Sequence, residues 1–297
     1  MNPGPTHQSP WDWRAAMQFI CGGAGAGLLL FTALSSLGDP AWLRRGGLLA
    51  GLLALVFVGL GLFFVWIKLG RRLRAAYVIL NPRTSWMSRE ALFAGGMGAL
   101  TLAGLVVQSP PLTLAAALFG LGYLFSQAQM FQTSRGIPAW RQPAITPLFF
   151  LTGLAEGGGL FALVALIFGG AAAWTTAALL LLVTARWLAW ARYFQQIAAP
   201  GAVPVRSLEI LSATRRLFVS GGHIAPALLL LLALAAQAAL PVAAALLAAL
   251  AGLLMIASGW YFKFNLITRA AFNQGFALTR TPARAPGHAG GPVKPGW

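Results

Sequence analysis

Long runs of apolar residues follow one another along the chain, and within them apolar and polar positions do not alternate. Continuous runs of this length favour buried helices over half-exposed strands. Backbone polar groups in lipid must bond within their own segment, so the runs predict transmembrane α-helices. The predicted spans are residues 15–37, 46–69, 90–107, 112–133, 145–168, 171–197, 223–240 and 242–268. The pattern therefore predicts an all-α polytopic membrane protein with about eight transmembrane helices.

Three joints between these spans are too short for anything except a hairpin. They lie at residues 108–111, 169–170 and 240–241, and each contains glycine or proline. A single helix over residues 145–197 would be far longer than a bilayer is thick, so a break is expected at Gly169–Gly170. Residues 1–10 and 279–297 are rich in Pro and Gly and are predicted to be disordered, which leaves residues 11–278 as one transmembrane domain.

Charge is scarce and one-sided. Only 9% of the residues are charged, against about 25% in soluble domains. The formal net charge of +16 comes from 21 Lys and Arg against five Asp and Glu. The basic residues cluster at span ends and in loops, which indicates membrane topology and contact with lipid, not nucleic-acid binding.

The basic residues also predict the orientation. Those in the loops after spans two, four and six and in the tail all lie on one side of an eight-span chain: Lys68, Arg71, Arg72, Arg74, Arg83, Arg89, Arg135, Arg141, Arg206, Arg215, Arg216, Arg269, Arg280, Arg284 and Lys294. The opposite side carries only Arg44 and Arg45. By the positive-inside rule, both termini are expected in the cytoplasm.

The chain offers few metal ligands. Cys21 is the only cysteine, and of the three histidines only His223 lies near a span. Neither a cysteine cluster nor a pair of facing histidines is available, so no haem or other metal is expected in this chain.

The segment from Lys68 to Glu90 carries the richest chemistry. Asn81-Pro82 predicts a turn, Ser88 a helix N-cap, and Glu90 a carboxylate in the first helical turn. One interpretation is a cap with basic anchors. The other is a polar floor beneath a ligand headgroup, where Glu90 exchanges protons and Trp86 stacks on a flat ring.

Four segments of the chain resemble one known family. They are Lys68-Leu-Gly…Arg74-Ala…Asn81…Ser85-Trp86…Ser88-Arg89-Glu90; Trp11-Asp-Trp13 with Gly22-Gly-Ala-Gly-Ala-Gly27; Ile137-Pro-Ala-Trp140…Pro147…Thr152-Gly-Leu-Ala-Glu-Gly-Gly-Gly159; and Gly259-Trp-Tyr-Phe-Lys-Phe264. Together they resemble the membrane anchor subunits of DMSO-reductase-type oxidoreductases, within the polysulfide reductase/NrfD superfamily. A weaker similarity, in Lys263-Phe-Asn265 and Arg269-Ala-Ala-Phe-Asn-Gln-Gly-Phe276, is to the phenylacetyl-CoA:acceptor oxidoreductase subgroup.

The resemblance implies a role and partners. Such anchors lie in the bacterial cytoplasmic membrane and hold a quinone, either menaquinone or ubiquinone, beside an iron–sulfur subunit that leads to a molybdenum or tungsten catalytic subunit. The candidate residues for quinone binding or proton transfer are Glu90, Lys68, Arg74, Trp86 and Gln18. The candidate docking residues are Arg71, Arg72, Arg89, Trp140 and Arg141. Some relatives carry a histidine where this chain has Lys68, which leaves the proton route open.

Two charged residues lie inside spans. Glu156 lies roughly 16 Å into span five, and Arg186 lies at similar depth in span six. Intramembrane charges usually pair inside the bundle, so an ion pair between them is expected. It is either structural or a proton-relay step. The alternative function is a small secondary transporter with its substrate site at this pair.

The orientation is directly testable. Alkaline phosphatase fused after residue 297 is expected to be inactive, because the basic loops should keep that end in the cytoplasm. The measurement is phosphatase activity in whole cells, with a fusion in the loop at Arg44 as the active control. High activity from the C-terminal fusion would contradict the eight-span arrangement.

Overall fold

The computed structural model describes residues 4–169 and 173–275. Within these ranges the regular structure is helical, and eight helical segments are long and apolar enough to cross a membrane. The α-helices are α1 Trp13–Gly38, α2 Leu48–Lys68, α3 Trp86–Val107, α4 Pro110–Gln132, α5 Ile145–Phe168, α6 Ala173–Ala198, α7 Val205–Val219, α8 Ala225–Ala236 and α9 Pro241–Phe264. The shorter helical turns are η1 Leu43–Gly47, η2 Arg72–Leu80, η3 Ser220–Ile224 and η4 Asn265–Arg269. The all-α, eight-span prediction is confirmed.

Local chemistry sets several helix ends. Asp12 caps α1 by accepting hydrogen bonds from the backbone N–H groups of Arg14 and Ala15. Ser85 caps α3 and accepts from the Ser88 N–H, so the predicted cap at Ser88 is three residues late. Gln108 ends α3 in the left-handed conformation with φ 56°, and Pro110 then begins α4. The joint predicted at Gly169–Gly170, and the start predicted at residue 171, lie partly outside the described residues.

The seventh span begins much earlier than predicted. The helix starts at Val205 instead of residue 223 and runs through η3 into α8 as one 32-residue segment. Its length is about 48 Å, well beyond a hydrocarbon core of roughly 30 Å. Arg206, Arg215 and Arg216 therefore lie on a helix and not in a loop. Hydropathy predicts where the apolar part of a helix begins, and in this segment the helix itself begins about five turns earlier, in a polar stretch.

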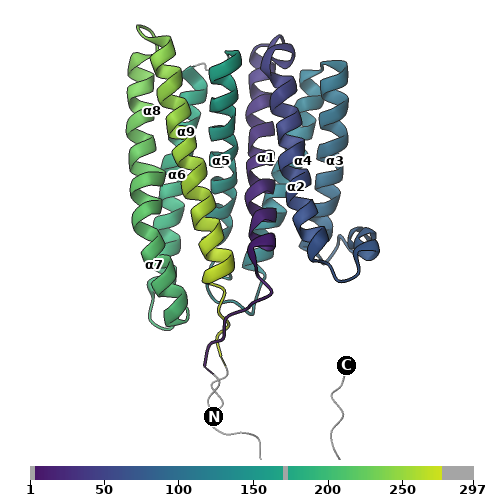
Figure 1. Ribbon diagram of the computed structural model, residues 1–297, viewed down its shortest axis with the longest axis vertical. Coiled ribbons are helices and arrows are strands. Elements are labelled where there is room, and N and C mark those ends of the chain that lie inside the picture. The colour runs from purple at the N-terminus through teal and green to yellow at the C-terminus, as the bar shows by residue number, and fades with distance from the viewer. Residues whose placement is uncertain (1–3, 170–172, 276–297) are drawn as a thin grey trace, which may run out of the picture.

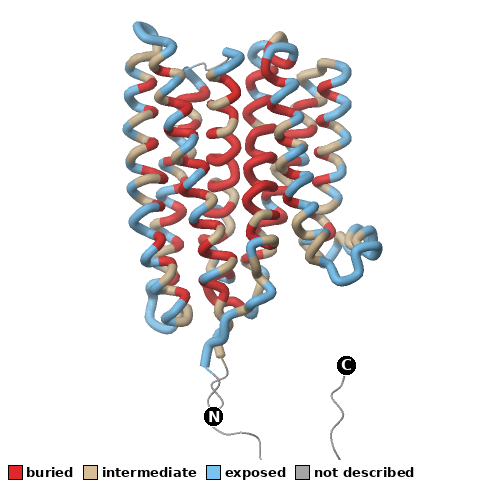
Figure 2. Tube along the Cα trace, in the orientation of Figure 1, coloured by how far each residue is buried: buried red, intermediate tan, exposed pale blue. Residues whose placement is uncertain are grey.

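The spans run side by side with α1 in the middle of the bundle (Figure 1). It is the most deeply buried span, and its trace is almost continuously buried in Figure 2. Glycines allow this packing, because a Cβ added at Gly157 would lie 2.2 Å from the backbone of Gly27. A Cβ at Gly159 would likewise lie 2.6 Å from the carbonyl oxygen of Gly252. Thus α5 contacts the backbones of both α1 and α9, as small residues permit in membranes.

The first and last residues that the structure describes come together at one end of the bundle (Figure 1). Residues 6–8 pair with residues 271–273 through backbone hydrogen bonds, and we call this pairing the terminal clasp. Asn273 adds side-chain bonds to both the N–H and the hydroxyl of Thr6. Residues 6–8, which belong to the segment predicted to be disordered, thus form hydrogen bonds with the C-terminal segment. The predicted disordered tail, residues 279–297, lies outside the described residues.

The loops predicted to share one side do so. Residues 69–85, 133–144 and 199–204 lie at the same end of the bundle as the terminal clasp (Figure 1). The loop with Arg44 and Arg45 lies at the other end. The basic loops therefore form one face, which we call the basic face.

A buried ion pair joins the three central helices. The Nζ of Lys263 on α9 lies 2.5 Å from Oε2 of Glu156 on α5, and both side chains are fully buried. The same Nζ donates to the carbonyl oxygen of Phe19 on α1, at 3.1 Å. A charge in lipid is stable only when its partners are protein groups, so this pair fixes α5, α9 and α1 relative to one another.

The predicted pair between Glu156 and Arg186 is wrong. Arg186 donates instead to the ring Nε2 of His223 at 3.2 Å, to the carbonyl oxygen of Met255 at 3.3 Å, and to that of Gly222. The short joint between the two spans predicts that both residues lie at similar depth in the membrane. It does not predict which side of its helix each side chain occupies. Lys263, 107 residues away in sequence, provides the nearer cation.

The pairing predicts strong coupling between Glu156 and Lys263. Removing either group alone leaves an uncompensated buried charge, at a cost of about 3–5 kcal/mol, whereas removing both should cost less than the sum. The measurement is a double-mutant cycle with Glu156→Gln and Lys263→Met on thermal unfolding in detergent. The cycle of Glu156→Gln with Arg186→Gln is the control. Coupling in the control as large as in the test cycle would contradict the assignment.

Candidate functional site

An apolar cavity of about 710 Å³ lies between α2, η2 and α3. Residues of all three elements line it, together with Gln18 of α1: Gln18, Leu62, Val65, Trp66, Leu69, Gly70, Arg71, Arg74, Ala75, Val78, Met87, Glu90, Ala91, Ala94 and Gly95. Leu62, Trp66 and Met87 are also exposed on the outside of the bundle. The cavity therefore opens to the outside of the bundle, the surface that faces lipid when the spans cross a membrane.

The inner end of the cavity is polar. Glu90 is buried there, and both of its carboxyl oxygens accept from Nε2 of Gln18, at 2.9 and 3.0 Å. Gln127 on α4 donates its Nε2 to Oε1 of Glu90 at 2.9 Å and also lies 2.9 Å from the Tyr123 hydroxyl. Thus α1, α3 and α4 each supply a side chain. We call Glu90, Gln18, Gln127 and Tyr123 the Glu90 cluster.

Amide groups, not cations, hold Glu90. Among the ion pairs of the described residues, none involves this carboxyl group. As a carboxylate it has its N–H donors from Gln18 and Gln127. When protonated, it could donate to Oε1 of Gln127, which is buried and without a hydrogen bond, after that amide rotates by half a turn. Both protonation states therefore have partners within the cluster.

Gly22 of α1 makes room for the cluster. A Cβ at this position would lie 2.3 Å from the Tyr123 hydroxyl and 2.6 Å from Nε2 of Gln127. At the next residue, Gly23, a Cβ would instead lie 2.7 Å from Nζ of Lys263. The Glu90 cluster and the Glu156–Lys263 pair thus contact neighbouring residues of one helix.

Three of the five residues predicted for this site line the cavity: Glu90, Gln18 and Arg74. Arg71, which the sequence placed in a docking surface, lines it as well. Sequence reasoning missed Tyr123 and Gln127. Their spacing of four residues within an apolar span places both on one helix face, and this was the signal that could have identified them.

Lys68 does not line the cavity. Its Nζ donates to the carbonyl oxygen of Pro10, lies 3.9 Å from Oδ1 of Asp12 and packs over the ring of Trp11. Partial burial acts to raise the pKa of Asp12, but hydrogen bonds from Arg14 and Ala15 and the charge of Lys68 outweigh it. The pKa of Asp12 therefore lies below its ordinary value, and its carboxylate helps to hold Lys68 against the N-terminal segment.

Trp86 also lies outside the cavity lining. The Arg89 guanidinium lies 4.1 Å from the centre of its ring, and Phe125 packs against the ring edge at 5.7 Å. Arg89 in turn donates to the carbonyl oxygens of Pro82 and Arg83, at 2.7 Å each. These contacts fold the loop before α3 and hold Trp86 beside Arg89, away from the residues that line the cavity.

The prediction that Trp140 docks a partner is wrong, because its side chain is fully buried. Its Nε1 donates to the carbonyl oxygen of Leu266 at 3.1 Å, and Trp11 covers the ring at 4.7 Å. The neighbouring Arg141 is exposed and lies 3.4 Å from Oε1 of Gln274. Trp140 thus supports the basic face from inside, while Arg141 lies on it.

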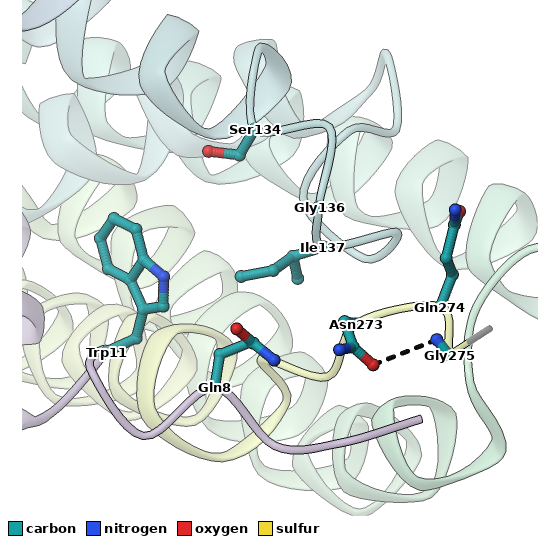
Figure 3. A pocket seen from close by; sticks show the side chains of 8 residues that line it. All are labelled: Gln8, Trp11, Ser134, Gly136, Ile137, Asn273, Gln274 and Gly275. Atoms are coloured by element: carbon teal, nitrogen blue, oxygen red, sulfur yellow. Dashed lines mark hydrogen bonds between the residues drawn. The ribbon is translucent and has the colours of Figure 1, made fainter. Parts of the chain in front are cut away.

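A second cavity of about 450 Å³ opens on the basic face beside the terminal clasp. Figure 3 shows Gln8 and Trp11 on one side, Ser134, Gly136 and Ile137 across from them, and Asn273, Gln274 and Gly275 at one end. The dashed line marks the bond from the Gly275 N–H to Oδ1 of Asn273, at 3.1 Å. Three segments that lie far apart in sequence build this cavity, and its amide side chains offer both donors and acceptors.

Within residues 4–169 and 173–275, no group of three or more His, Cys, Asp or Glu side chains is placed to hold a metal ion. His223 is engaged by Arg186 through one ring nitrogen and by the carbonyl oxygen of Phe218 through the other, at 2.7 Å.

Comparison with known proteins identifies the family. Residues 7–192 match the DMSO reductase anchor subunit (DmsC) family, a stretch that contains the apolar cavity and the whole Glu90 cluster. No curated protein matches the chain. The match covers more than half of the sequence and agrees with the eight apolar spans. The chain therefore belongs to the DMSO reductase anchor subunit family and is the membrane anchor of a DMSO reductase-type complex.

Proposed function

We propose that this anchor binds a membrane quinone in the cavity between α2, η2 and α3 and passes electrons between it and an iron–sulfur partner subunit. The observation that carries the proposal is the position of Glu90, a buried carboxyl group at the polar end of an apolar cavity that reaches lipid. Such a cavity combines what a quinone requires, an apolar channel for the tail and hydrogen-bonding groups for the head.

The residues of the cavity fit this ligand class. The walls are aliphatic along α2 and α3, and a volume of about 710 Å³ lies within the range of small-molecule sites. At the inner end, Gln18 and Glu90 provide an amide donor and a proton carrier. Menaquinone and ubiquinone both have a planar head with two carbonyl groups, and these contacts suit either one.

The proposed chemistry couples electrons to protons. A bound quinone takes up two electrons and two protons on reduction and releases them on oxidation. Glu90 would transfer a proton at the ligand oxygen, while Gln18 and Gln127 hold the carboxyl group in place in either protonation state. Arg74 lines the cavity from its η2 side and would stabilise negative charge that develops on the headgroup.

The partner subunits follow from the family. An anchor of this kind is expected to hold an iron–sulfur subunit, which leads to a molybdenum or tungsten catalytic subunit. We propose that the iron–sulfur subunit docks on the basic face, with Arg141, Arg89 and the cavity beside the terminal clasp at its centre. An acidic surface on the partner would be steered to this face by charge.

The proposal includes an orientation and a subgroup. We place the protein in a bacterial cytoplasmic membrane with the basic face, and hence both termini, in the cytoplasm. The C-terminal segment that resembles the phenylacetyl-CoA subgroup contributes residues 271–273 to the terminal clasp. A cytoplasmic catalytic partner would agree with a CoA thioester as its substrate, since these thioesters are cytoplasmic.

The transporter alternative loses its structural basis. It required a substrate site built on Glu156 together with Arg186, and these residues bind different partners. Family membership also favours the anchor function.

Glu90→Gln tests the proton-transfer role. The amide preserves shape and keeps one acceptor oxygen for Gln18 and Gln127 but removes the titratable proton, so quinone turnover by the complex should fall at least about tenfold. Reduction or oxidation of a soluble dye by the catalytic partner should be unchanged, because it bypasses this chain. The matched control is Glu209→Gln on α7, an exposed carboxylate paired with Arg206. Wild-type rates of both quinone and dye turnover in Glu90→Gln would overturn this site assignment.

Arg141→Glu tests the docking face. Reversal of this exposed charge should repel an acidic partner, and several-fold less iron–sulfur subunit should co-purify with membranes at physiological salt. Arg44→Glu, at the opposite end of the bundle, is the control with the same charge change. Equal recovery of the partner from both variants would place the docking surface elsewhere.

A further inference from the structure

A separate basic cavity lies at the turn between α2 and η2. Its volume is about 620 Å³, and residues 67–74 line it. It shares residues 69–71 and Arg74 with the apolar cavity between α2, η2 and α3. It does not include Gln18 or Glu90, and Lys68 and Arg72 line this basic cavity but not the apolar one. The two cavities thus lie on either side of one short turn.

The turn carries a concentrated positive charge. Lys68, Arg71, Arg72 and Arg74 lie within seven residues. Among the described residues, Lys68 forms an ion pair with Asp12 at 3.9 Å, and no ion pair involves any of the three arginines. Arg72 lies 5.5 Å from the ring centre of Trp66. The turn therefore presents guanidinium groups without anionic partners.

The adjoining helix η2 is apolar on its outer surface. It has no buried residue, Leu73 is 96% exposed, and Tyr77 and Leu80 are largely exposed as well. In Figure 1 η2 projects from the outer edge of the bundle at the level where α2 and α3 end. Short amphipathic helices at this level lie in the interface between lipid headgroups and acyl chains. Exposed Leu, Tyr and Trp side chains beside arginines match that environment.

We infer that this turn is a binding site for an anionic phospholipid, with the headgroup phosphate held by Arg71 and Arg72. The acyl chains would pack against Trp66 and the apolar side chains of η2. Guanidinium groups bind phosphate oxygens through paired hydrogen bonds, and basic pockets at span ends are suited to anionic headgroups. A docked protein is the weaker explanation, because the exposed apolar side chains lie at the edge of the bundle and away from the terminal clasp.

The test measures lipid binding to the purified complex in a neutral detergent. Short-chain dioctanoyl phosphatidylglycerol is titrated and bound lipid is counted by native mass spectrometry, with dioctanoyl phosphatidylcholine as the neutral lipid and glycerol 3-phosphate as the headgroup alone. We expect phosphatidylglycerol to bind in preference to both. Each neutralised arginine should weaken its binding about fivefold, so Arg71→Gln with Arg72→Gln should weaken it about 25-fold.

Matched variants separate specific binding from general charge. Arg215→Gln with Arg216→Gln removes the same charge from the exposed surface of α7, far along the sequence, and should leave binding unchanged. Leu73→Asn should weaken binding of phosphatidylglycerol without any change of charge. These results together would support the site.

Three outcomes would overturn the inference. Equal loss of binding in the two double variants would mean that only net charge matters. Glycerol 3-phosphate that binds as tightly as the lipid would indicate a site for a free phosphate anion. Release of the iron–sulfur subunit from Arg71→Gln with Arg72→Gln, with unchanged lipid binding, would assign the turn to protein docking.

Discussion

The structure depends on one constraint, that polar groups inside a bilayer must find their partners within the protein. Helix α1 meets this constraint for two separate groups of residues. Gly22 faces the Glu90 cluster and Gly23 faces Lys263, so one glycine pair gives space to both. Larger residues at these positions would meet the Tyr123 hydroxyl or the Lys263 ammonium directly. The central position of α1 therefore follows from the polar side chains that the neighbouring helices bury against it.

Most of the fold could be predicted from the sequence because hydropathy reports burial in lipid, and helices are the available way to satisfy the backbone there. The seventh span shows where this reasoning ends. Its helix begins at Val205, well before the apolar run, since hydrogen bonding along a helix continues outside the bilayer. Side-chain pairing was also beyond the sequence pattern. Glu156 pairs with Lys263, because rotation about each helix axis and the packing of distant spans decide which cation is nearest.

The members of the candidate site that lie close together in sequence could be predicted. Those that helix packing brings in from distant parts of the chain could not. Arg74 and Glu90 come from one loop and the helix that follows it, and both line the cavity. Lys68 belongs to the same loop, but the carbonyl oxygen of Pro10 and the carboxylate of Asp12 hold it outside the cavity. Gln127 belongs to the site but lies on α4, outside the loop motif, so the motif does not predict its role. A motif thus identifies the neighbourhood of a site, while the packed helices select its members.

The two buried glutamates show how environment assigns different tasks to one side chain. Glu156 bonds directly to a cation, and protonation of this carboxylate would leave the charge of Lys263 uncompensated inside the bundle. Glu90 has the amides of Gln18 and Gln127 and the Tyr123 hydroxyl around it, and such neutral groups can serve as partners whether the carboxyl group is charged or neutral. It also lines a cavity that reaches lipid, whereas Glu156 is enclosed among α1, α5 and α9. The first pair is therefore suited to holding helices together, and Glu90 is the carboxyl group suited to exchanging a proton with a ligand.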